Sequence, residues 1–412
     1  MNAIFAEPGV FEAMSRRARE RRAQAADRRR RLDARAIVAP LVAAAALAWA
    51  QAALADDGSP FMPPPAPKPN IVRLLAPPDY FDPQTLEEFE RASGYQIAYD
   101  AYDEAAGVAR KWREGPYDLV VLPGPALASE IALGALGRLD KKLIPNARAI
   151  QPPVAAKLDA YDRGGVYSVP LGWYATGLIF DADKAAKRLG GPPMSWAYVF
   201  APDLARKMAD CGIALPDARD ALFIAAWRMT GIDPARATAS AVKNAGAVIS
   251  RALTMARAFP ARDVAGALAS GAACLAVGDA GEAHAAVARS RAGGALVDVR
   301  FSLPWEGGAL SLDALAMPRD APHPAQAYAL LDFLLQSDVA LRDARAAGLV
   351  SALDGGQNEL LRRAWPEGAS DPRLAAAVQS EWARLRAGQA SRPAVEAPHR
   401  PASALGSRRK RQ

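Results

Sequence analysis

Residues 70 to 122 constrain the fold most, because short apolar runs alternate there with amphipathic segments. Three strand-like runs, NIVRLLA (70–76), YQIAYDAY (95–102) and YDLVVL (117–122), are separated by two helix-like segments. Two parallel strands can be joined only by a crossover, and the crossover is usually a helix. The order strand, helix, strand, helix, strand therefore predicts a parallel sheet and an α/β protein.

The first helix of this series has clear sequence signals at both ends. Asp82 is a suitable N-cap, and Pro83 falls at the first helical position. Leu86 and Phe89 share one face of the helix, and Gly94 is placed to end it. We expect a helix over 83–93 that packs one face against the sheet.

The length of 412 residues predicts two lobes, since one hydrophobic core rarely grows to that size. A second alternating series begins at VYSVPL (166–171) and ATGLIF (175–180), which flank residues 172–174. We expect the chain to pass from one lobe to the other there. No internal repeat of fixed period is visible.

The basic charge of +7 lies at the two ends of the chain. Residues 1–55 and 387–412 each carry a net charge of +5, which leaves −3 for residues 56–386. A nucleic-acid-binding body would carry clustered Lys and Arg on the folded part itself. The charge pattern therefore argues against a nucleic-acid partner.

The N-terminal 55 residues have the pattern of an export signal. An Arg-rich stretch precedes the apolar run 36–50, and Ala53-Leu54-Ala55 is a small-x-small cleavage pattern. We expect cleavage between Ala55 and Asp56, with export to the periplasm. An uncleaved anchor is the alternative, and translation from Met14 would give a shorter charged region. The Pro-rich segment 56–69 is expected to be a linker, and 387–412 a disordered basic tail.

The chain contains two cysteines, Cys211 and Cys274, each at the start of a strand-like run. In an exported protein such a pair most simply forms a disulfide, and two buried free thiols are the alternative. Closing a loop of about 60 residues would stabilise the fold by about 4 kcal/mol in the chain-entropy model.

Signatures of catalysis are missing from the sequence. It has no G-x-S-x-G, no P-loop, no G-x-G-x-x-G after a strand, and no His/Cys cluster with metal-ligand spacing. The sequence therefore predicts no catalytic residue, no metal site and no cofactor.

Acidic residues instead follow the strand-like runs, where open parallel sheets bind ligands. A cationic ligand suits such a place, because carboxylates replace lost hydration and aromatic faces add cation–π attraction. Each acid alone is more simply a helix cap or a solvated loop residue. The candidates are Asp79 with Tyr80, Asp217, Asp220, Asp279, Glu282 and Asp313.

From Asn70 to Asp354 the chain resembles the periplasmic putrescine/spermidine-binding proteins of bacterial polyamine ABC importers. Segments that carry the resemblance are PDYFDPQTLEEFERASGYQIAYDAYDE, YDLVVLPGPAL, YSVPLGWYATGLIFD, CLAVGDAGEA and FSLPWEGGALSLDALAMP. The resemblance implies a type II periplasmic-binding-protein fold, in which two α/β lobes close like a hinge on a ligand cleft. We expect lobe 1 to comprise 70–171 plus 284–342, and lobe 2 to comprise 172–283 plus 343–386.

The resemblance also implies the function and the cysteine pairing. A small cationic solute, a polyamine, would be carried as a monomer to the permease subunits of an ABC transporter, without catalysis. Close relatives have this cysteine pair disulfide-bonded, which supports Cys211 to Cys274.

The family's ligand site is only partly kept in this sequence. Asp79 and Tyr80 match the family, but Pro77 and Pro78 replace a Trp and a Ser or Thr. The other matched positions are Asp217, Asp220 one place before a family acid, Asp279 for a Trp, Glu282 for an Asp, Ser311 for an aromatic residue, Asp313, and Leu349 for a Tyr.

These departures keep the carboxylates and remove most of the aromatic side chains. Each missing cation–π contact would weaken the binding of a polyamine by about 0.5 to 2 kcal/mol. Trp173, Tyr174 and Trp305 could supply other aromatic faces, although we expect them to serve hinge or core packing. Two alternatives remain: a fold re-purposed for a non-polyamine solute or a protein partner, and an enzyme that uses Asp79 and Asp313 as acid and base.

Overall fold

The computed structural model describes residues 70–102, 107–261, 263–294, 296–368 and 371–390. The expected signal peptide, its cleavage site, the linker 56–69 and the tail beyond residue 390 lie outside the described residues. Within the expected tail, 387–390 belong to the last helix, α17 (Pro372–Ala390).

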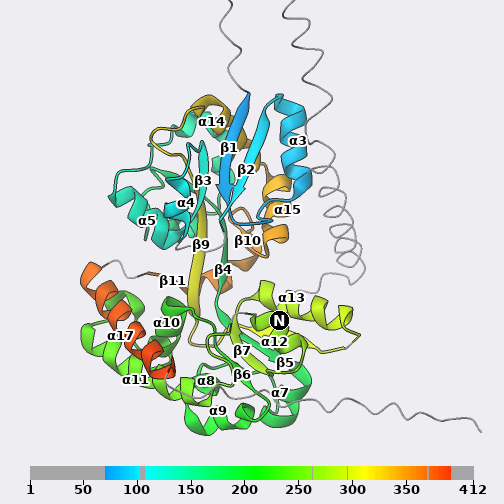
Figure 1. The fold of residues 1–412 in the computed structure, drawn as a ribbon, viewed down its shortest axis with the longest axis vertical. Coiled ribbons are helices and arrows are strands. Elements are labelled where there is room, and N and C mark those ends of the chain that lie inside the picture. Colours follow the sequence, from blue (N-terminus) through cyan, green and yellow to red (C-terminus); the bar gives the residue numbers. More distant parts are fainter. Residues whose placement is uncertain (1–69, 103–106, 262, 295, 369–370, 391–412) are drawn as a thin grey trace, which may run out of the picture. The chain divides into compact units, whose positions relative to one another are not determined.

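The first sheet has seven strands in the order β10-β4-β9-β3-β1-β2, and β11 also pairs with β9 (Figure 1). β1 is parallel to β2 and to β3, which confirms the parallel arrangement expected for residues 70–122. β9 runs antiparallel to β3 and β4, so the sheet as a whole is mixed. The strand bounds are β1 Ile71–Ala76, β2 Gln96–Ala101, β3 Leu119–Pro123, β4 Ser168–Ala175, β9 Gly308–Ala316, β10 Val350–Ser351 and β11 Ala364–Pro366.

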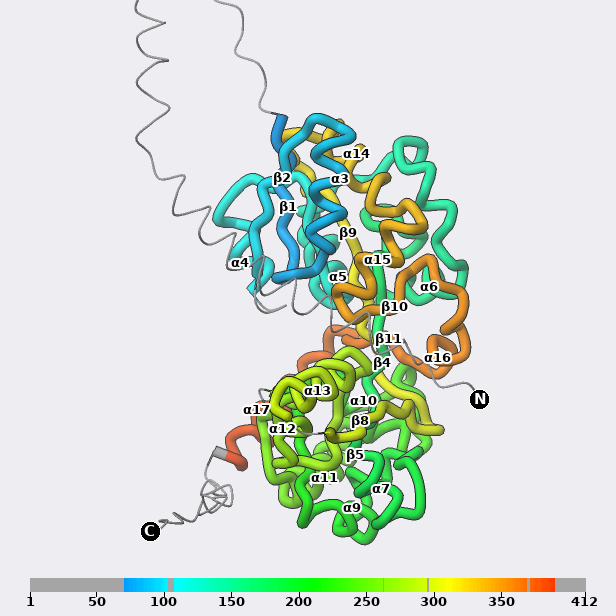
Figure 2. The backbone as a smooth tube through the Cα atoms, turned by 90° about the vertical axis from the view of Figure 1, so that its right-hand side faces the viewer, coloured from blue at the N-terminus to red at the C-terminus, as the bar shows by residue number. Residues whose placement is uncertain are grey.

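Helices cover both faces of this sheet. On one face α3 lies beside α14 and α15 (Figure 2). Phe89 of α3 shares a core there with Leu331 and Val339. On the other face Leu127 and Leu158 belong to a separate core. The helices of the first face are α3 Pro83–Ser93, α14 Pro324–Leu334 and α15 Ser337–Ala347; those of the second are α4 Val108–Trp112, α5 Gly124–Ala132, α6 Pro152–Leu158 and α16 Asn358–Arg362.

The first helix has the expected caps. The Asp82 carboxylate accepts a hydrogen bond of 2.8 Å from the Gln84 amide, and Pro83 is the first helical residue. Gly94 ends α3 with φ of 73°, a left-handed conformation that favours glycine.

The second sheet has four strands in the order β6-β7-β5-β8. Trp196 and Phe223 are fully buried in the larger core of this half, while α12 and α13 pack together beside β5 and β8 (Figure 2). The strands are β5 Gly177–Asp181, β6 Ile213–Ala214, β7 Leu275–Gly278 and β8 Val299–Ser302. The helices are α7 Ala182–Leu189, α8 Ala197–Phe200, α9 Pro202–Ala209, α10 Arg219–Met229, α11 Ala239–Met255, α12 Val264–Ala269 and α13 Ala280–Ala292, with α17 beside α11.

Two connections between the sheets run side by side, at Thr176 and at residues 303–307. The Thr176 amide donates to the Ala309 carbonyl over 2.9 Å. A Cβ at Gly308 would lie 2.0 Å from the Thr176 carbonyl oxygen, so this close approach requires glycine. The first connection lies just after residues 172–174, which are themselves part of β4 in the first sheet. The two α/β lobes are confirmed.

The lobe boundaries differ from those expected for two segments. β8 pairs with β5, and α13 packs on α12, so residues 284–302 belong with the second sheet. β10 pairs with β4, so 350–351 belong with the first sheet. Ala283 and Ala286 of α13 share a core with Val264 and Leu268 of α12, which places this helix in the second lobe.

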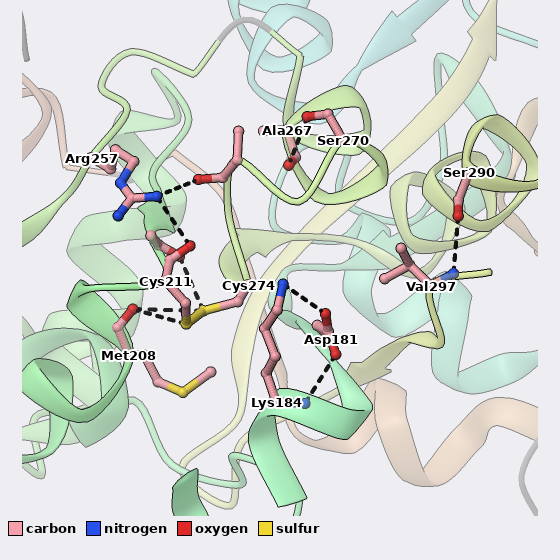
Figure 3. A network of polar contacts seen from close by, with 12 residues as sticks. Asp181, Lys184, Met208, Cys211, Arg257, Ala267, Ser270, Cys274, Ser290 and Val297 are labelled. Carbon is pink, nitrogen blue, oxygen red and sulfur yellow. Dashed lines mark hydrogen bonds and ion pairs between the residues drawn. A yellow bond between two sulfur atoms is a disulfide. The ribbon is translucent and has the colours of Figure 1, made fainter. Parts of the chain in front are cut away.

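A disulfide between Cys211 and Cys274 confirms the expected pairing, with 5.7 Å between the two Cα atoms (Figure 3). It joins the loop before β6 to the start of β7. Arg257 donates to the Cys211 and Ala272 carbonyls over 3.4 and 3.3 Å. The disulfide thus fastens two neighbouring strands of the second sheet.

Candidate functional site

Asp313 is a carboxylate in the middle of β9, opposite Gly172 of β4 and Pro123 at the end of β3. Burial raises the pKa of its carboxyl to about 6, because loss of hydration penalises the charge. Tyr80 lies beside it and is only 6% exposed. Among the described residues, no partner lies within hydrogen-bonding geometry of the buried Tyr80 hydroxyl. The hydroxyl is nevertheless close enough to Asp313 to lower the pKa of that carboxyl, which partly offsets the effect of burial.

Glu367, which the sequence patterns did not single out, lies near Asp313 at the end of β11. The Ser311 hydroxyl donates to Glu367 Oε2 over 2.7 Å. Burial raises the pKa of the Glu367 carboxyl to about 7, and the charges of Asp220 and Asp313 raise it further, while Arg219 lowers it. Ser311 and Asp313, both expected at the site, are therefore joined there by an unexpected third residue.

Two tyrosines show through their pKa values which carboxylates share this neighbourhood. Burial raises the pKa of the Tyr174 phenol, and Glu367, Asp313 and Asp279 each raise it further. The pKa of Tyr161 is raised by burial and then by Glu367, Asp220 and Asp313. Glu367 and Asp313 thus raise the pKa of both phenols, whereas Asp279 acts on Tyr174 and Asp220 acts on Tyr161.

Asp220 enters this neighbourhood already paired with a cation. Arg219 Nε and Nη2 lie 2.8 and 2.9 Å from the two Asp220 carboxylate oxygens. This bidentate bond neutralises Asp220 at the start of α10.

Asp279 and Glu282 form a capping box at the start of α13. Glu282 N donates to Asp279 Oδ1 over 3.0 Å, and Asp279 N donates to Glu282 Oε2 over 3.1 Å. Burial raises the pKa of the Asp279 carboxyl, and burial followed by the Asp279 charge raises the pKa of Glu282 to about 7. Both residues thus have a structural role, and the charge of Asp279 also raises the pKa of Tyr174.

Two predicted residues stand apart. Asp217 is exposed and accepts from Trp382 Nε1 over 3.1 Å, while Arg386 lies 2.6 Å from its other oxygen. Asp79 is exposed and has a positive φ of 56°, which is uncommon for a residue other than glycine. Both carboxylate oxygens of Asp217 are therefore bound by side chains of α17.

The aromatic residues considered as replacements separate into three cases. Trp173 is 2% exposed and belongs to the core of the first lobe. Trp305 is 68% exposed, with the Arg363 guanidinium 5.8 Å from its ring. Tyr174 lies close enough to Glu367 and Asp313 for their charges to raise its pKa.

We define the carboxylate cluster as Asp313, Glu367 and Asp279, with the Arg219–Asp220 pair at its edge. Burial raises the pKa values of all three acids. In the described part of the chain, no three His, Cys, Asp or Glu side chains are placed to hold a metal ion. The arrangement suits a ligand with separated positive charges.

A family model described as bacterial extracellular solute-binding protein matches residues 84–375. The putrescine/agmatine-binding protein of Pseudomonas aeruginosa is 30% identical over 274 residues, which cover 66% of this chain and 75% of that protein. The putrescine-binding periplasmic protein of Escherichia coli K12 is 30% identical over 266 residues, covering 63% and 72%.

Solved structures of similar fold include a spermidine/putrescine ABC transporter substrate-binding protein from Streptococcus pneumoniae. Its TM-score is 0.65 at 16% identity, covering 77% of this chain and 98% of that one. The Tp0655 lipoprotein of Treponema pallidum has a TM-score of 0.66 at 20% identity, with coverages of 76% and 99%. Among the helices that the structure describes, none is both long and apolar enough to cross a membrane.

Proposed function

The chain belongs to the family of bacterial extracellular solute-binding proteins, and we propose that its solute is a small polyamine. Proteins of this family bind solutes and are not enzymes. Putrescine, agmatine or spermidine would bind at the carboxylate cluster and be delivered to the permease of an ABC importer. By name, the Pseudomonas aeruginosa relative binds putrescine and agmatine, and the Escherichia coli relative binds putrescine.

The observation that carries this proposal is the placing of two buried carboxylates: Ser311 on β9 donates to Glu367 Oε2 over 2.7 Å, and Asp313 lies two residues further along the same strand. Burial raises the pKa of both carboxyls. An ammonium group placed between them would restore the charged forms and take the place of lost water. The nearby phenol of Tyr174 would supply an oxygen acceptor, and its ring a face for cation–π attraction. Together these groups would partly replace the aromatic side chains that the family has at the positions of Pro77, Ser311 and Leu349.

Closure would occur at the paired connections between the lobes. The segments around Thr176 and Gly308 are short, adjacent and hydrogen-bonded, as suits a hinge that rotates without unfolding. Asp79 and Tyr80 follow β1 in the first lobe, whereas Asp279 and Glu282 begin α13 in the second. A closed cleft would then collect acids from both lobes.

The same proposal includes the localisation of the protein and its oligomeric state. The Arg-rich N-terminus with cleavage between Ala55 and Asp56 supports export to the periplasm, where a monomer would meet its permease. The net charge of −3 on residues 56–386 supports a partner other than a nucleic acid.

A thermal-shift screen of the mature chain against putrescine, cadaverine, agmatine and spermidine tests the proposal. We expect at least one amine to raise Tm by several degrees at millimolar concentration, because a ligand that binds only the native state stabilises it. No shift with any amine would overturn the proposal. A non-cationic metabolite found by mass spectrometry of gently purified protein would favour a re-purposed fold.

A further inference from the structure

The backbone of Glu367 is held from two sides. Its amide donates to the Leu310 carbonyl over 3.0 Å, which extends the pairing of β9 with β11 by one residue. The Tyr161 hydroxyl donates to its carbonyl over 2.7 Å. Gly368 follows with φ of +81°, a conformation that favours glycine. Glu367 therefore occupies a fixed position at the end of a short strand.

The side chain of Glu367 is directed by Ser311. Ser311 is 7% exposed, and its hydroxyl lies 2.7 Å from Glu367 Oε2. Ser311 and Asp313 are two residues apart on β9, so their side chains leave the same face of the sheet about 7 Å apart. The Asp313 carboxylate and the Glu367 carboxylate, which Ser311 binds, therefore lie on the same side of β9.

Charged and titratable groups around Glu367 come from four elements. They are Asp313 on β9, Asp220 and Arg219 on α10, Tyr174 on β4, and Tyr161 after α6. Of these described groups Arg219 is the cation, and Asp220 already binds its guanidinium through two hydrogen bonds. The negative charge of Glu367 is thus left for a further cation to balance.

We propose that Glu367 is a ligand-binding carboxylate that pairs with Asp313, so that each accepts one charged nitrogen of a dication. The proposal rests on the proposed function and adds a residue to it. Ser311 replaces a family aromatic residue and recruits Glu367, so a charge pair stands where the resemblance implies a cation–π contact. A charge pair at each end favours a diamine over a monoamine more strongly than one aromatic face would.

The pH dependence of binding follows from the same arrangement. The Glu367 carboxyl has a pKa raised to about 7 by burial, so a proton competes with the ligand below neutral pH. Diamine affinity should therefore fall as pH drops from 8 to 6, by up to about tenfold per pH unit below the pKa.

Isothermal titration of the mature chain with putrescine, agmatine and butylamine at pH 6, 7 and 8 tests the proposal. Butylamine matches putrescine in chain length and lacks one charge. Glu367→Gln should bind the diamines at least about tenfold more weakly at pH 8 and bind butylamine nearly unchanged. Its affinity should also vary less with pH, and Glu367→Asp should recover part of the loss.

The matched control is Glu359→Gln, because Glu359 is exposed and paired with Arg362 away from the cluster. It should bind like the wild type. Ser311→Ala keeps Glu367 but removes the hydroxyl that binds its carboxylate. Its selectivity for diamines over butylamine should fall several-fold, which tests the proposal even if Glu367→Gln folds poorly.

The outcomes separate the two proposals. A wild-type chain that binds a diamine, together with a Glu367→Gln chain of unchanged selectivity and pH dependence, overturns the role of Glu367 alone. A wild-type chain that binds no amine at any pH overturns the proposed function, and the role of Glu367 with it.

Discussion

Asp217 and Asp313 were predicted as ligand carboxylates on the same grounds, and the fold treats them in opposite ways. Asp217 is exposed and bonded to Arg386 and Trp382 of α17. Asp313 lies in the middle of a strand, and burial raises the pKa of its carboxyl to about 6. The difference teaches that a carboxylate after or within a strand is informative only once its counter-charge is known.

Asp220 and Glu367 repeat the contrast at close range. The fold supplies Asp220 with the guanidinium of Arg219, in two hydrogen bonds. Glu367 receives a neutral hydroxyl from Ser311 instead. The acids left without a bound cation are those that we assign to the ligand.

The largest expected effect is on diamine affinity, when the buried Asp313 and the exposed Asp217 are each replaced by asparagine. Asp313→Asn should weaken diamine binding by about 100-fold or more, because removing one member of a desolvated charge pair costs about 2–5 kcal/mol. Asp217→Asn should stay within about twofold of the wild type. Isothermal titration at pH 8 measures both variants.

Equal losses in these two variants would break the comparison, since Asp217 would then also belong to the site. A monitored Tm for each variant separates lost binding from lost folding.

A smaller effect is expected in the stability of the ligand-free chain as pH changes. The folded-state pKa values of Asp313, at about 6, and Glu367, at about 7, are raised by burial above their unfolded values. The folded state therefore binds more protons than the unfolded state between about pH 4 and 7, and the free energy of unfolding falls as pH rises through that window. From pH 5.5 to pH 8 the summed loss should be about 3 kcal/mol.

Urea unfolding at pH 5.5 and pH 8 measures this dependence. Glu367→Gln should flatten it and should raise the stability of the ligand-free chain at pH 8. Glu359→Gln is the control. Hydrogen bonding to Arg362 lowers the pKa of Glu359, so this substitution should not raise the stability of the ligand-free chain at pH 8. A wild-type chain that is more stable at pH 8 than Glu367→Gln would contradict the account.

The smallest effect should follow the loss of the cation that neutralises Asp217. Arg386→Ala breaks a half-exposed ion pair, and such pairs contribute about 0–1 kcal/mol. Unfolding in urea should show at most that loss, and diamine affinity should remain unchanged. A clear loss of affinity would connect α17 to the ligand and remove the distinction drawn between the two aspartates.

Local patterns predicted the parts of the fold that depend on neighbouring residues. Asp82, Pro83 and Gly94 punctuate α3 as expected, because capping and backbone conformation are decided within a few positions. The parallel pairing of β1 with β2 and β3 follows from the alternation of runs. The lobe boundaries were harder, because α13 is placed by packing on α12 and not by its own composition.

Members of the candidate site could be predicted from the sequence only where they share a strand or follow one. Tyr80, Ser311 and Asp313 were expected and lie together. Glu367 was missed, because it follows a strand of three residues and meets Ser311 across 56 positions of sequence. The pairing of Asp217 with α17 spans 165 positions to Trp382, beyond any local pattern.

The number of protons released when a diamine binds tests the central claim most directly. Titration calorimetry at pH 7 in two buffers of different ionisation enthalpy gives that number. If the ligand takes the place of protons on Asp313 and Glu367, the wild type should release a substantial fraction of a proton, and Glu367→Gln should release less. Tight binding with no proton exchange in the wild type would contradict the account.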